Sequence, residues 1–535
     1  MTSQARANLD APDVSATRVA KLADLLTGAT LAVRLMPARL AAAHQLAIRE
    51  LGAVLIVAAA FRYIDLGAVG LNSDEAVYAG QSASLAGNPH FTSLFPIVRA
   101  HPLLMQLVMA PLYRSGVVDT PGRYVAASFG VATVALVYVL GRVLYDHRVA
   151  TVGALLLAVM PYHVVIGRQI MLDGPMAFFT TAALLCLALA ARRNARAGWM
   201  VAAGACIGLA TLTKETAIIM IGSAFAFICL TSHMWRPLRF PFAGAGIALL
   251  LTFAYPVLTA MSGGSRSGQN YLLWQLTREP NHDFGFYVVV VGGAIGFGLL
   301  AVALLGLFGR RFTGRAITWR EGLLLSWIIV PFAFFQIWPV KGFSYLMPLA
   351  PAIAVLGARA LIPVAERLRT RNGRRYVAVV TPLVVLSLAI PAVLRVVSPT
   401  TSGLAGAGGL PGGREVGRWV DVHVPIGSHL ITIGPSMANV IQYYSGRSCD
   451  ALSVSPNPLH RNPTYQPIIN ADAELKAANY EYIVWDAYSA RRSPHFAARA
   501  NQLAHRFGGH VVHVQRGDVD GKSNQPLIVI YEVHP

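Results

Sequence analysis

Long runs of apolar residues alternate with short polar segments as far as residue 396. A transmembrane helix needs about 20 consecutive apolar residues to cross the hydrocarbon core of a bilayer. Runs that approach this length predict eleven membrane spans, at residues 51–70, 124–144, 149–167, 174–191, 199–213, 216–232, 240–261, 286–308, 322–340, 345–365 and 376–396. The pattern therefore predicts a polytopic α-helical membrane protein, with residues 51–396 as its transmembrane domain.

The loops between these predicted spans differ in their arginine content. Alternate loops hold clusters of arginine, at Arg142–Arg148, Arg192–Arg196, Arg236–Arg239, Arg310–Arg320 and Arg367–Arg375. Because loops rich in lysine and arginine stay in the cytoplasm, we expect these loops and the basic N-terminal segment 1–50 to be cytoplasmic. An odd number of spans then places the C-terminus outside. We expect a multi-pass protein of the cell membrane in this orientation.

Residues 101–118 are apolar enough to suggest one more span. A span there would reverse every later loop and move the arginine clusters to the outer side, against the charge pattern. We therefore expect a helix that lies at the outer membrane surface or dips into it. It belongs to one large external loop, residues 71–123.

The pattern changes after residue 396. Residues 397–413 include a glycine-rich run that predicts a flexible linker. In residues 414–535, short apolar runs typical of strands alternate with helical patterns. The predicted strands are 429–433, 482–485, 511–514 and 527–532, and the predicted helices are 414–423, 435–445, 471–478 and 495–507. This indicates a small extracytoplasmic α/β domain.

Composition agrees with a chain that is solvated largely by lipid. Hydrophobic residues make up 55% of the chain and charged residues 13%, whereas soluble domains carry about 25% charged residues. The formal net charge of +19 would suggest nucleic acid in a soluble protein. Here the basic residues lie between apolar runs, which indicates membrane lipid as the partner and no nucleic acid.

The first polar motif of interest is Asn72-Ser73-Asp74-Glu75-Ala76-Val77-Tyr78, directly after the first predicted span. Two adjacent carboxylates at the outer boundary of the membrane can be partly desolvated. Desolvation raises the basicity of a carboxylate and suits a general base. The alternative is structural, because Ser73 or Asp74 would also be an ordinary N-cap of the helix that follows.

Further polar residues fall at the predicted outer ends of other spans: His101, Arg168, Asp173, Lys214 with Glu215, Lys341 and Tyr345. Each alone also fits an ordinary span end, where lysine and arginine extend towards the membrane surface, and Lys214 could simply pair with Glu215. Together they predict a rim of cations and carboxylates around one opening. Charge-assisted hydrogen bonds to phosphate are strong, so the rim predicts a site for a phosphate or diphosphate group.

These motifs resemble those of the GT-C glycosyltransferases, in the branch with dolichyl-phosphate-mannose–protein mannosyltransferases and bacterial aminoarabinose transferases. The resemblance covers roughly residues 50–365 and rests on Asp74-Glu75-Ala76-Val77-Tyr78, His101-Pro102-Leu103 with its spacing to Arg123, Arg168…Asp173-Gly174-Pro175, Leu212-Thr213-Lys214 and Lys341-Gly342-Phe343-Ser344-Tyr345-Leu346-Met347-Pro348. The chain departs from many relatives at Leu103, where they have a second proline, and at Ser344, where they have arginine.

The resemblance implies an enzyme that moves a hexosyl or pentosyl group, with inversion, from a polyprenyl-phosphate donor to a protein, lipid or cell-envelope glycan on the outer face. It implies Asp74 as the catalytic base or metal-proximal carboxylate, and Glu75 as its assistant or as a second ligand of Mg²⁺ or Mn²⁺. The implied contacts to the donor phosphate are Arg168, Lys214, Lys341 and Tyr345. Tyr78, His101 and Asp173 are further candidate site residues.

Two other functions fit a membrane protein of this size. A transporter or lipid flippase would hold ionisable residues near the bilayer midplane in repeated halves, but the predicted spans hold few such residues and show no repeat. A purely structural membrane protein would leave the clustered rim without a reason. In the C-terminal domain, aromatic residues could stack on an acceptor sugar or simply form its core: Tyr443, Tyr444, Tyr465, Trp485 and Tyr488.

Overall fold

The computed structural model describes residues 45, 47–97, 101–114, 116–192, 197–231, 234, 239–261, 274–275, 277–308, 317–367, 371–398, 409–519 and 522–534. The predicted cytoplasmic segment before residue 45 and residues 399–408 of the predicted linker lie outside this part of the chain. Residues 1–53 and 54–535 form two compact units, and the architecture below is that of the second unit.

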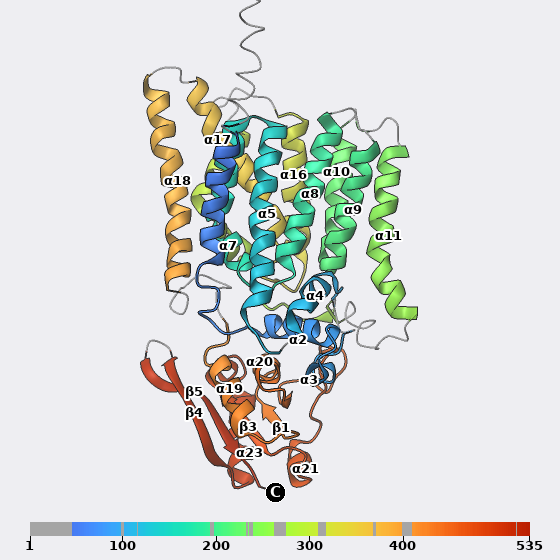
Figure 1. The fold of residues 1–535 in the computed structure, drawn as a ribbon, viewed down its shortest axis with the longest axis vertical. Helices are drawn as coiled ribbons and strands as arrows, with labels where there is room; N and C mark the ends of the chain where they lie inside the picture. The colour runs from blue at the N-terminus through green and yellow to red at the C-terminus, as the bar shows by residue number, and fades with distance from the viewer. Residues whose placement is uncertain are drawn as a thin grey trace, which may run out of the picture. The chain divides into compact units, whose positions relative to one another are not determined.

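Helices follow the predicted spans closely. After a helix that continues to residue 63, they are α5 (Thr120–Leu144), α6 (His147–Val159), α7 (Pro161–Gly167), α8 (Asp173–Arg192), α9 (Ala197–Thr213), η2 (Glu215–Ile218), α10 (Ile219–Leu230), α11 (Arg239–Met261), η4 (Tyr287–Val291), α13 (Gly292–Ile295), α14 (Phe297–Phe308), α16 (Trp319–Ile337), η5 (Met347–Leu349), α17 (Ala350–Arg367) and α18 (Arg371–Val397). Figure 1 shows the longer of these helices side by side.

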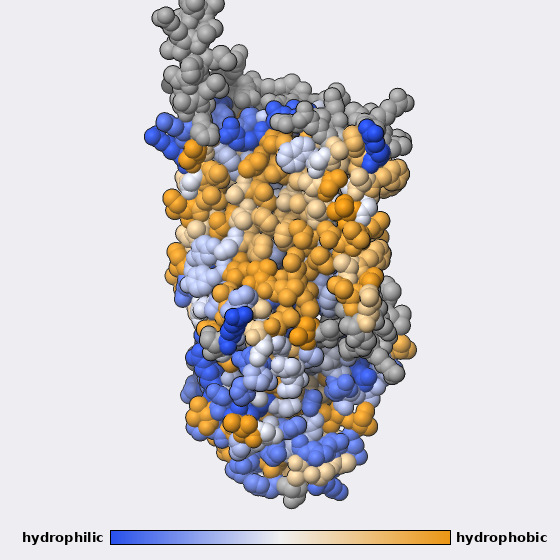
Figure 2. All heavy atoms as spheres, turned by 45° about the vertical axis from the view of Figure 1, so that its right-hand side comes forward, coloured by the Kyte–Doolittle hydropathy of each residue, from blue (hydrophilic) through white to orange (hydrophobic). Residues whose placement is uncertain are grey.

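In the described residues, five helices are long and apolar enough to cross a membrane, and the total is seven if each of two bent helix pairs is one span. Shorter apolar helices accompany them. Figure 2 shows a band of hydrophobic side chains over the helical region, with hydrophilic residues at both ends of the band. A helical fold with several membrane-length apolar helices is thus confirmed, while the count of eleven spans and the orientation stay predictions.

Each bent pair has a local cause. α6 and α7 meet at 60°, because Pro161 has no N–H to continue the helix. The guanidinium of Arg62, which is fully buried, donates hydrogen bonds to Leu157 O at 3.3 Å and Ala158 O at 2.9 Å. A buried arginine therefore satisfies carbonyls at the bend. In the second pair, Gly296 at φ 104° turns the chain by 94° between α13 and α14, a backbone angle that favours glycine.

The segment between residues 71 and 119 forms short helices: α2 (Ser73–Leu85), α3 (Pro89–Thr92), α4 (Leu104–Met109) and η1 (Ala110–Tyr113). The apolar stretch Leu104–Tyr113 is one of the shorter apolar helices and not one of the membrane-length helices. A short helix is thus present within residues 101–118, while its place at the outer membrane surface and the external loop 71–123 stay predictions. Figure 1 shows α2, α3 and α4 at one end of the long helices, next to the C-terminal domain.

The C-terminal domain is a small α/β domain, as predicted. Its elements are α19 (Gly413–His423), β1 (His429–Thr432), α20 (Pro435–Ser445), β2 (Ser448–Ala451), α21 (Ala471–Lys476), β3 (Tyr482–Asp486), α22 (Ala487–Arg492), α23 (Pro494–Arg506), β4 (His510–Val519) and β5 (Lys522–Glu532). The strand order is β2-β1-β3-β5-β4. β1 runs parallel to β2 and β3, and β5 runs antiparallel to β3 and β4.

The two faces of this sheet pack into different cores. Successive side chains of a strand point to opposite faces, so Leu430 and Ile431 of β1 belong to separate hydrophobic clusters. The Ile431 cluster lies within the domain and includes α23. The Leu430 cluster also contains Tyr78 and Tyr113 of the first loop. The C-terminal domain and the loop before α5 therefore share one hydrophobic core.

The end of the predicted linker takes part in this packing. Leu410 N donates to Leu71 O at 3.4 Å, and a Cβ at Gly409 would come within 2.1 Å of Gly70 O. Backbone therefore packs directly on backbone at Gly409, where a side chain has no room. The boundaries of the linker and of the two predicted domains remain predictions.

Candidate active site

Glu75 lies in the first turn of α2, is 1% exposed and is fully hydrogen-bonded within the protein. Its Oε1 accepts from Arg123 Nε at 2.8 Å and from Ile170 N at 3.0 Å. Its Oε2 accepts from Arg123 Nη2 at 2.7 Å and from Asn72 N at 3.0 Å. A carboxylate offers roughly four lone-pair sites, and four donors occupy them. This geometry favours a structural role for Glu75 over the catalytic or metal-binding role implied by the resemblance.

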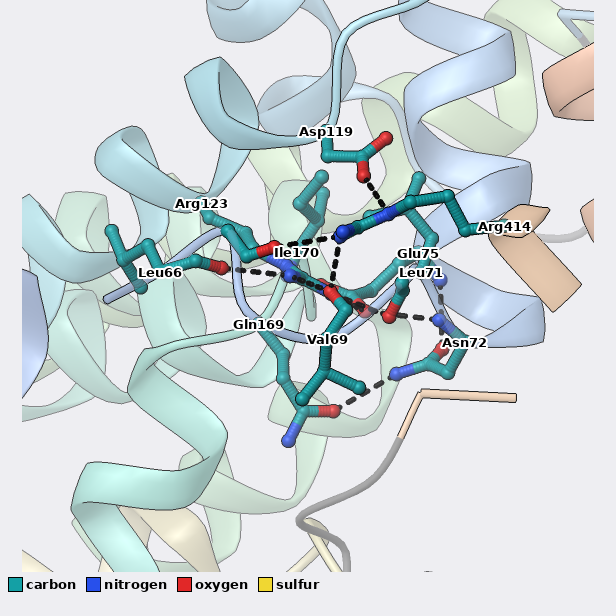
Figure 3. Close-up of polar contacts among 12 residues, drawn as sticks. Leu66, Val69, Leu71, Asn72, Glu75, Asp119, Arg123, Gln169, Ile170 and Arg414 are labelled. Atoms are coloured by element: carbon teal, nitrogen blue, oxygen red, sulfur yellow. Dashed lines mark hydrogen bonds and ion pairs between the residues drawn. The ribbon is translucent and has the colours of Figure 1, made fainter. Parts of the chain in front are cut away.

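Arg123, in the first turn of α5, is the centre of this arrangement. Besides Glu75, it donates to Leu66 O, Val69 O and Gly70 O at 2.8, 2.6 and 3.0 Å. Asn72 completes a capping box with Glu75, and its Nδ2 donates to Gln169 Oε1 at 2.9 Å. Figure 3 shows these side chains converging on the turn before α2. We call Asn72, Glu75, Arg123 and Gln169 the buried clamp.

The C-terminal domain fastens the same turn from the other side. Arg414 of α19 forms an ion pair with Asp119 at 2.6 Å and donates to Gly67 O and Val69 O at 2.9 and 2.7 Å (Figure 3). From α20, the Tyr444 hydroxyl accepts from Leu71 N at 3.0 Å. Burial, and after it the nearby Asp119, raises the pKa of Tyr444, so this hydroxyl stays neutral. Two elements of the domain thus hold the start of α2.

Tyr443 and Tyr444 therefore serve packing and anchoring, and not sugar stacking. Tyr443 is 0% exposed and donates to Val118 O at 3.0 Å, and Tyr444 is 3% exposed. Tyr465 contacts Asn439 at 2.9 Å, and Asn439 also donates to Ser73 Oγ at 2.9 Å. The core interpretation holds for Tyr443 and Tyr444, while Tyr488, at 42% exposure, remains on the surface.

Asp74 differs from its neighbour Glu75 because its side chain is exposed. It lies in the first turn of α2, on the same face as Tyr78 four residues later. The Tyr78 ring meets the His101 ring edge-on, with centroids 6.0 Å apart. The face of α2 that carries Asp74 is thus also the face that contacts His101.

A second group of titratable side chains begins at His101. His101 Nδ1 lies 2.8 Å from Glu215 Oε2. The adjacent Lys214 donates to both oxygens of Asp173, each at 2.8 Å, and this pair is buried. We call His101, Asp173, Lys214 and Glu215 the charged cluster. The sequence left open a simple pair of Lys214 with its neighbour Glu215, but Lys214 pairs with Asp173, at the start of α8.

Tyr345 lies beside the charged cluster, and Lys341 lies four residues before Tyr345 in the chain. The Lys214 ammonium is 4.9 Å from the centre of the Tyr345 ring. Lys341 is 5% exposed, and its Nζ donates to Trp338 O at 3.2 Å. Among the described residues no carboxylate pairs with Lys341, so its charge is not neutralised there as the charge of Lys214 is by Asp173.

Arg168 does not join the charged cluster. Its guanidinium donates to Phe61 O at 3.0 Å and Asp65 O at 3.1 Å, at the end of the first helix. The following residue, Gln169, belongs to the buried clamp. The structure therefore brings together five of the predicted site residues (Tyr78, His101, Asp173, Lys214 and Tyr345). The Lys341 ammonium instead contacts Trp338 O and the Phe284 ring.

The donor set at this site does not favour the predicted Mg²⁺ or Mn²⁺ at Asp74 and Glu75, because the oxygens of Glu75 already have their donors. In the part of the chain that the structure describes, the group of three or more ligand residues close enough to share a metal ion is His510, Glu532 and His534, in the C-terminal domain. No step of the reaction proposed below passes through a metal ion.

Sequence reasoning missed the partners that hold these residues. In the sequence, Arg123 was noted only for its spacing from His101-Pro102-Leu103. An arginine at the start of a long apolar run is itself a signal for a buried ion pair. Glu215 was considered only as a partner of Lys214. Arg414 follows a glycine-rich run and gives no sequence signal, since its role depends on the docking of the C-terminal domain.

This chain is similar to known proteins in both sequence and structure. Residues 100–259 match the family model described as dolichyl-phosphate-mannose-protein mannosyltransferase. ArnT from Cupriavidus metallidurans bound to undecaprenyl phosphate has a similar structure, with a TM-score of 0.63 and 16% identity over 91% of this chain and 97% of that one. The chain has the fold of the GT-C glycosyltransferases. The resemblance seen in its motifs is thereby confirmed.

Other GT-C proteins extend the comparison. The archaeal oligosaccharyltransferase AglB from Archaeoglobus fulgidus, in complex with an inhibitory peptide and a dolichol-phosphate, has a TM-score of 0.57 and 16% identity, over 87% of this chain and 73% of AglB. Undecaprenyl phosphate-alpha-4-amino-4-deoxy-L-arabinose arabinosyl transferase 2 of Proteus mirabilis is 24% identical over 252 residues. That match spans 44% of each protein. These similarities give no support to a transporter or flippase.

Proposed function

We propose that this GT-C protein is a membrane glycosyltransferase that moves a sugar from a polyprenyl-phosphate donor to an acceptor hydroxyl. The observation that carries the proposal is the position of Asp74. Its side chain is exposed in the first turn of α2, and Tyr78 of the same helix contacts His101 of the charged cluster. Tyr78 thus connects the helix that carries Asp74 to a cluster of titratable side chains on a GT-C fold.

The donor phosphate needs its developing negative charge stabilised as the sugar leaves. We propose Lys341 as its principal contact, because it is a buried ammonium without a carboxylate partner among the described residues. Lys214 contributes less charge, since Asp173 neutralises it at 2.8 Å. Its position over the Tyr345 ring instead fixes the tyrosine next to the phosphate site. Arg168 takes no part in this step.

The acceptor needs its hydroxyl proton removed as it attacks the anomeric carbon. Asp74 is the proposed base: the acceptor oxygen forms the new glycosidic bond, its proton passes to the Asp74 carboxylate, and the polyprenyl phosphate departs. Direct attack from the side opposite the phosphate inverts the anomeric centre. Glu75 acts indirectly, because the buried clamp fixes the first turn of α2 and with it the direction of Asp74.

The finer features belong to the same proposal. The reaction takes place on the outer face of the cell membrane, with the C-terminal domain outside. The donor carries a hexose or a pentose, and the acceptor is a protein, a lipid or a cell-envelope glycan. AglB was solved with a dolichol-phosphate and ArnT with undecaprenyl phosphate, which supports a lipid-linked donor for this chain.

The experiment uses the full-length chain in liposomes with a panel of polyprenyl-phosphate-linked hexoses and pentoses and an envelope extract as acceptor. Mass spectrometry would detect the glycosylated product and the released polyprenyl phosphate, and NMR would assign the anomer. We expect release of polyprenyl phosphate together with a covalent product of inverted configuration. Movement of the donor across the bilayer without any covalent product would contradict the proposal and restore the flippase alternative.

A further inference from the structure

Three ligand-type side chains meet at one end of the C-terminal sheet. His510 Nε2 lies 3.0 Å from Glu532 Oε2, and the rings of His510 and His534 stack with centroids 5.5 Å apart. One ligand atom from each of the three residues lies within 4.8 Å of the others. Figure 1 shows the C-terminus at the end of the domain that lies away from the helices, so this group is separate from the charged cluster.

The backbone, and not chance rotamers, brings the three side chains together. His510 is the first residue of β4 and Glu532 the last of β5, and the two are paired directly in the antiparallel ladder. Glu532 and His534 are two residues apart, so an extended backbone presents them on one face. His534 N donates to Phe507 O at 3.2 Å and Val533 N to Glu481 O at 2.9 Å. These bonds fix the chain beyond β5.

We propose that His510, Glu532 and His534 bind a divalent transition-metal ion, Zn²⁺ in the first instance. Two imidazoles and one carboxylate are a borderline ligand set that suits zinc, with bonds of about 2.0–2.2 Å. Such bonds place neighbouring ligand atoms of a tetrahedral site about 3.4 Å apart. The 3.0 Å between His510 and Glu532 needs only a small adjustment. Water fills the fourth position.

A further contact orients the carboxylate. The Tyr482 hydroxyl of β3 donates to Glu532 Oε1 at 3.3 Å, which leaves Oε2 facing His510. Residues that orient a ligand in this way commonly change metal affinity by about 10–100-fold when they are replaced. The site thus draws on β3, β4, β5 and the segment after β5.

The bound ion ties the edge strand of the sheet to the segment that follows β5. β4 is the outermost strand, next to β5, and its start would then be joined to His534 as well as to its ladder partner. The structural alternative is an exposed histidine–glutamate ion pair that binds no metal. It predicts no zinc site at these residues, and the test below separates the two.

The test uses the full-length chain in detergent, purified without a polyhistidine tag and treated with a chelator. Zn²⁺ is then titrated against a competing chromophoric chelator, and bound metal is counted by elemental analysis. The variants are His510→Gln, His534→Gln and Tyr482→Phe. The matched control is His505→Gln, because His505 is an exposed histidine of α23 outside the site. Thermal unfolding without zinc checks that all variants fold.

We expect the wild type and His505→Gln to bind one Zn²⁺ that both His510→Gln and His534→Gln lose. In Tyr482→Phe the affinity of this ion should fall by about 10–100-fold. Zinc should raise the thermal midpoint of the wild type and control and leave that of His510→Gln unchanged. Equal zinc stoichiometry and affinity in wild type, His510→Gln and His534→Gln would overturn the proposal, and so would a folded wild type that binds no zinc.

Discussion

The buried clamp and the charged cluster use the same kinds of residue for different ends. In the clamp, every lone pair of Glu75 has a donor, and Arg123 is surrounded by Glu75 and three carbonyls. The charged cluster consists of two further pairs, His101 with Glu215 and Lys214 with Asp173. Lys341, by contrast, is buried without a carboxylate partner among the described residues. A saturated ion pair can only hold structure, whereas a cation without a counter-ion can receive an anionic ligand. The sequence neighbours Asp74 and Glu75 differ as well, because Glu75 is buried in the clamp and the side chain of Asp74 is exposed.

The largest expected effect comes from replacing Arg123 of the buried clamp. Replacement Arg123→Met leaves the buried carboxylate of Glu75 without its cation and removes the donors of three backbone carbonyls. Breaking a buried pair by removing one partner costs about 3–5 kcal/mol. We expect a large fall in the thermal midpoint of the detergent-solubilised protein. Arg123→Lys keeps the charge but loses the planar, bidentate guanidinium. Its thermal midpoint should therefore lie between those of the wild type and Arg123→Met. An Arg123→Met protein as stable as the wild type would contradict a structural clamp.

A smaller effect should distinguish Lys341 from Lys214 by donor KM and by stability. Lys341→Met removes a contact to the donor phosphate worth about 1.5–3 kcal/mol, so the KM for the donor should rise by about 10–100-fold with little change in unfolding temperature. Lys214→Met should also destabilise the fold, because it leaves Asp173 buried and unpaired. Donor titrations and thermal unfolding of both variants provide the measurement. Equal loss of stability in the two variants would contradict the different roles proposed for Lys341 and Lys214.

The smallest effect concerns the anchor from the C-terminal domain. Tyr444→Phe removes the acceptor of Leu71 N at 3.0 Å, a neutral hydrogen bond worth about 0.5–1.5 kcal/mol. We expect a modest drop in the transfer rate through a looser start of α2, with donor KM unchanged. Tyr488→Phe, on the exposed surface of the domain, is the control. A rise in donor KM without a change in rate would place Tyr444 near the donor instead.

Much of the fold could be predicted from sequence because apolar run length and strand periodicity are local signals. α5, α8 and α16 begin and end within a few residues of their predicted spans, and the four predicted strands are present. Local signals were weaker where the chain bends. Pro161 and Gly296 lie inside predicted spans and break them. The strand β2 and the helix α22 are short and were not predicted.

Several of the candidate site residues lie together in the structure, but their pairings could not be predicted from the sequence. Residue types and span ends pointed to His101, Asp173 and Lys214, because ionised groups at span ends are conspicuous. Which residue pairs with which depends on tertiary packing. Glu75 and Arg123 are separated by 48 positions in the chain and Lys214 and Asp173 by 41. No periodicity records such distances, so adjacency in the sequence suggested the wrong partner for Lys214.

The most direct test of the account is sugar transfer by Asp74→Asn from a polyprenyl-phosphate donor in liposomes. Loss of a general base lowers rates by about 10²–10⁴-fold. We predict a fall of this size with an unchanged thermal midpoint, while Asp518→Asn, at an exposed position of β4, transfers sugar like the wild type. Transfer by Asp74→Asn at the wild-type rate would contradict the central claim, which is that the exposed carboxylate of the pair performs the chemistry and the buried one holds it in place.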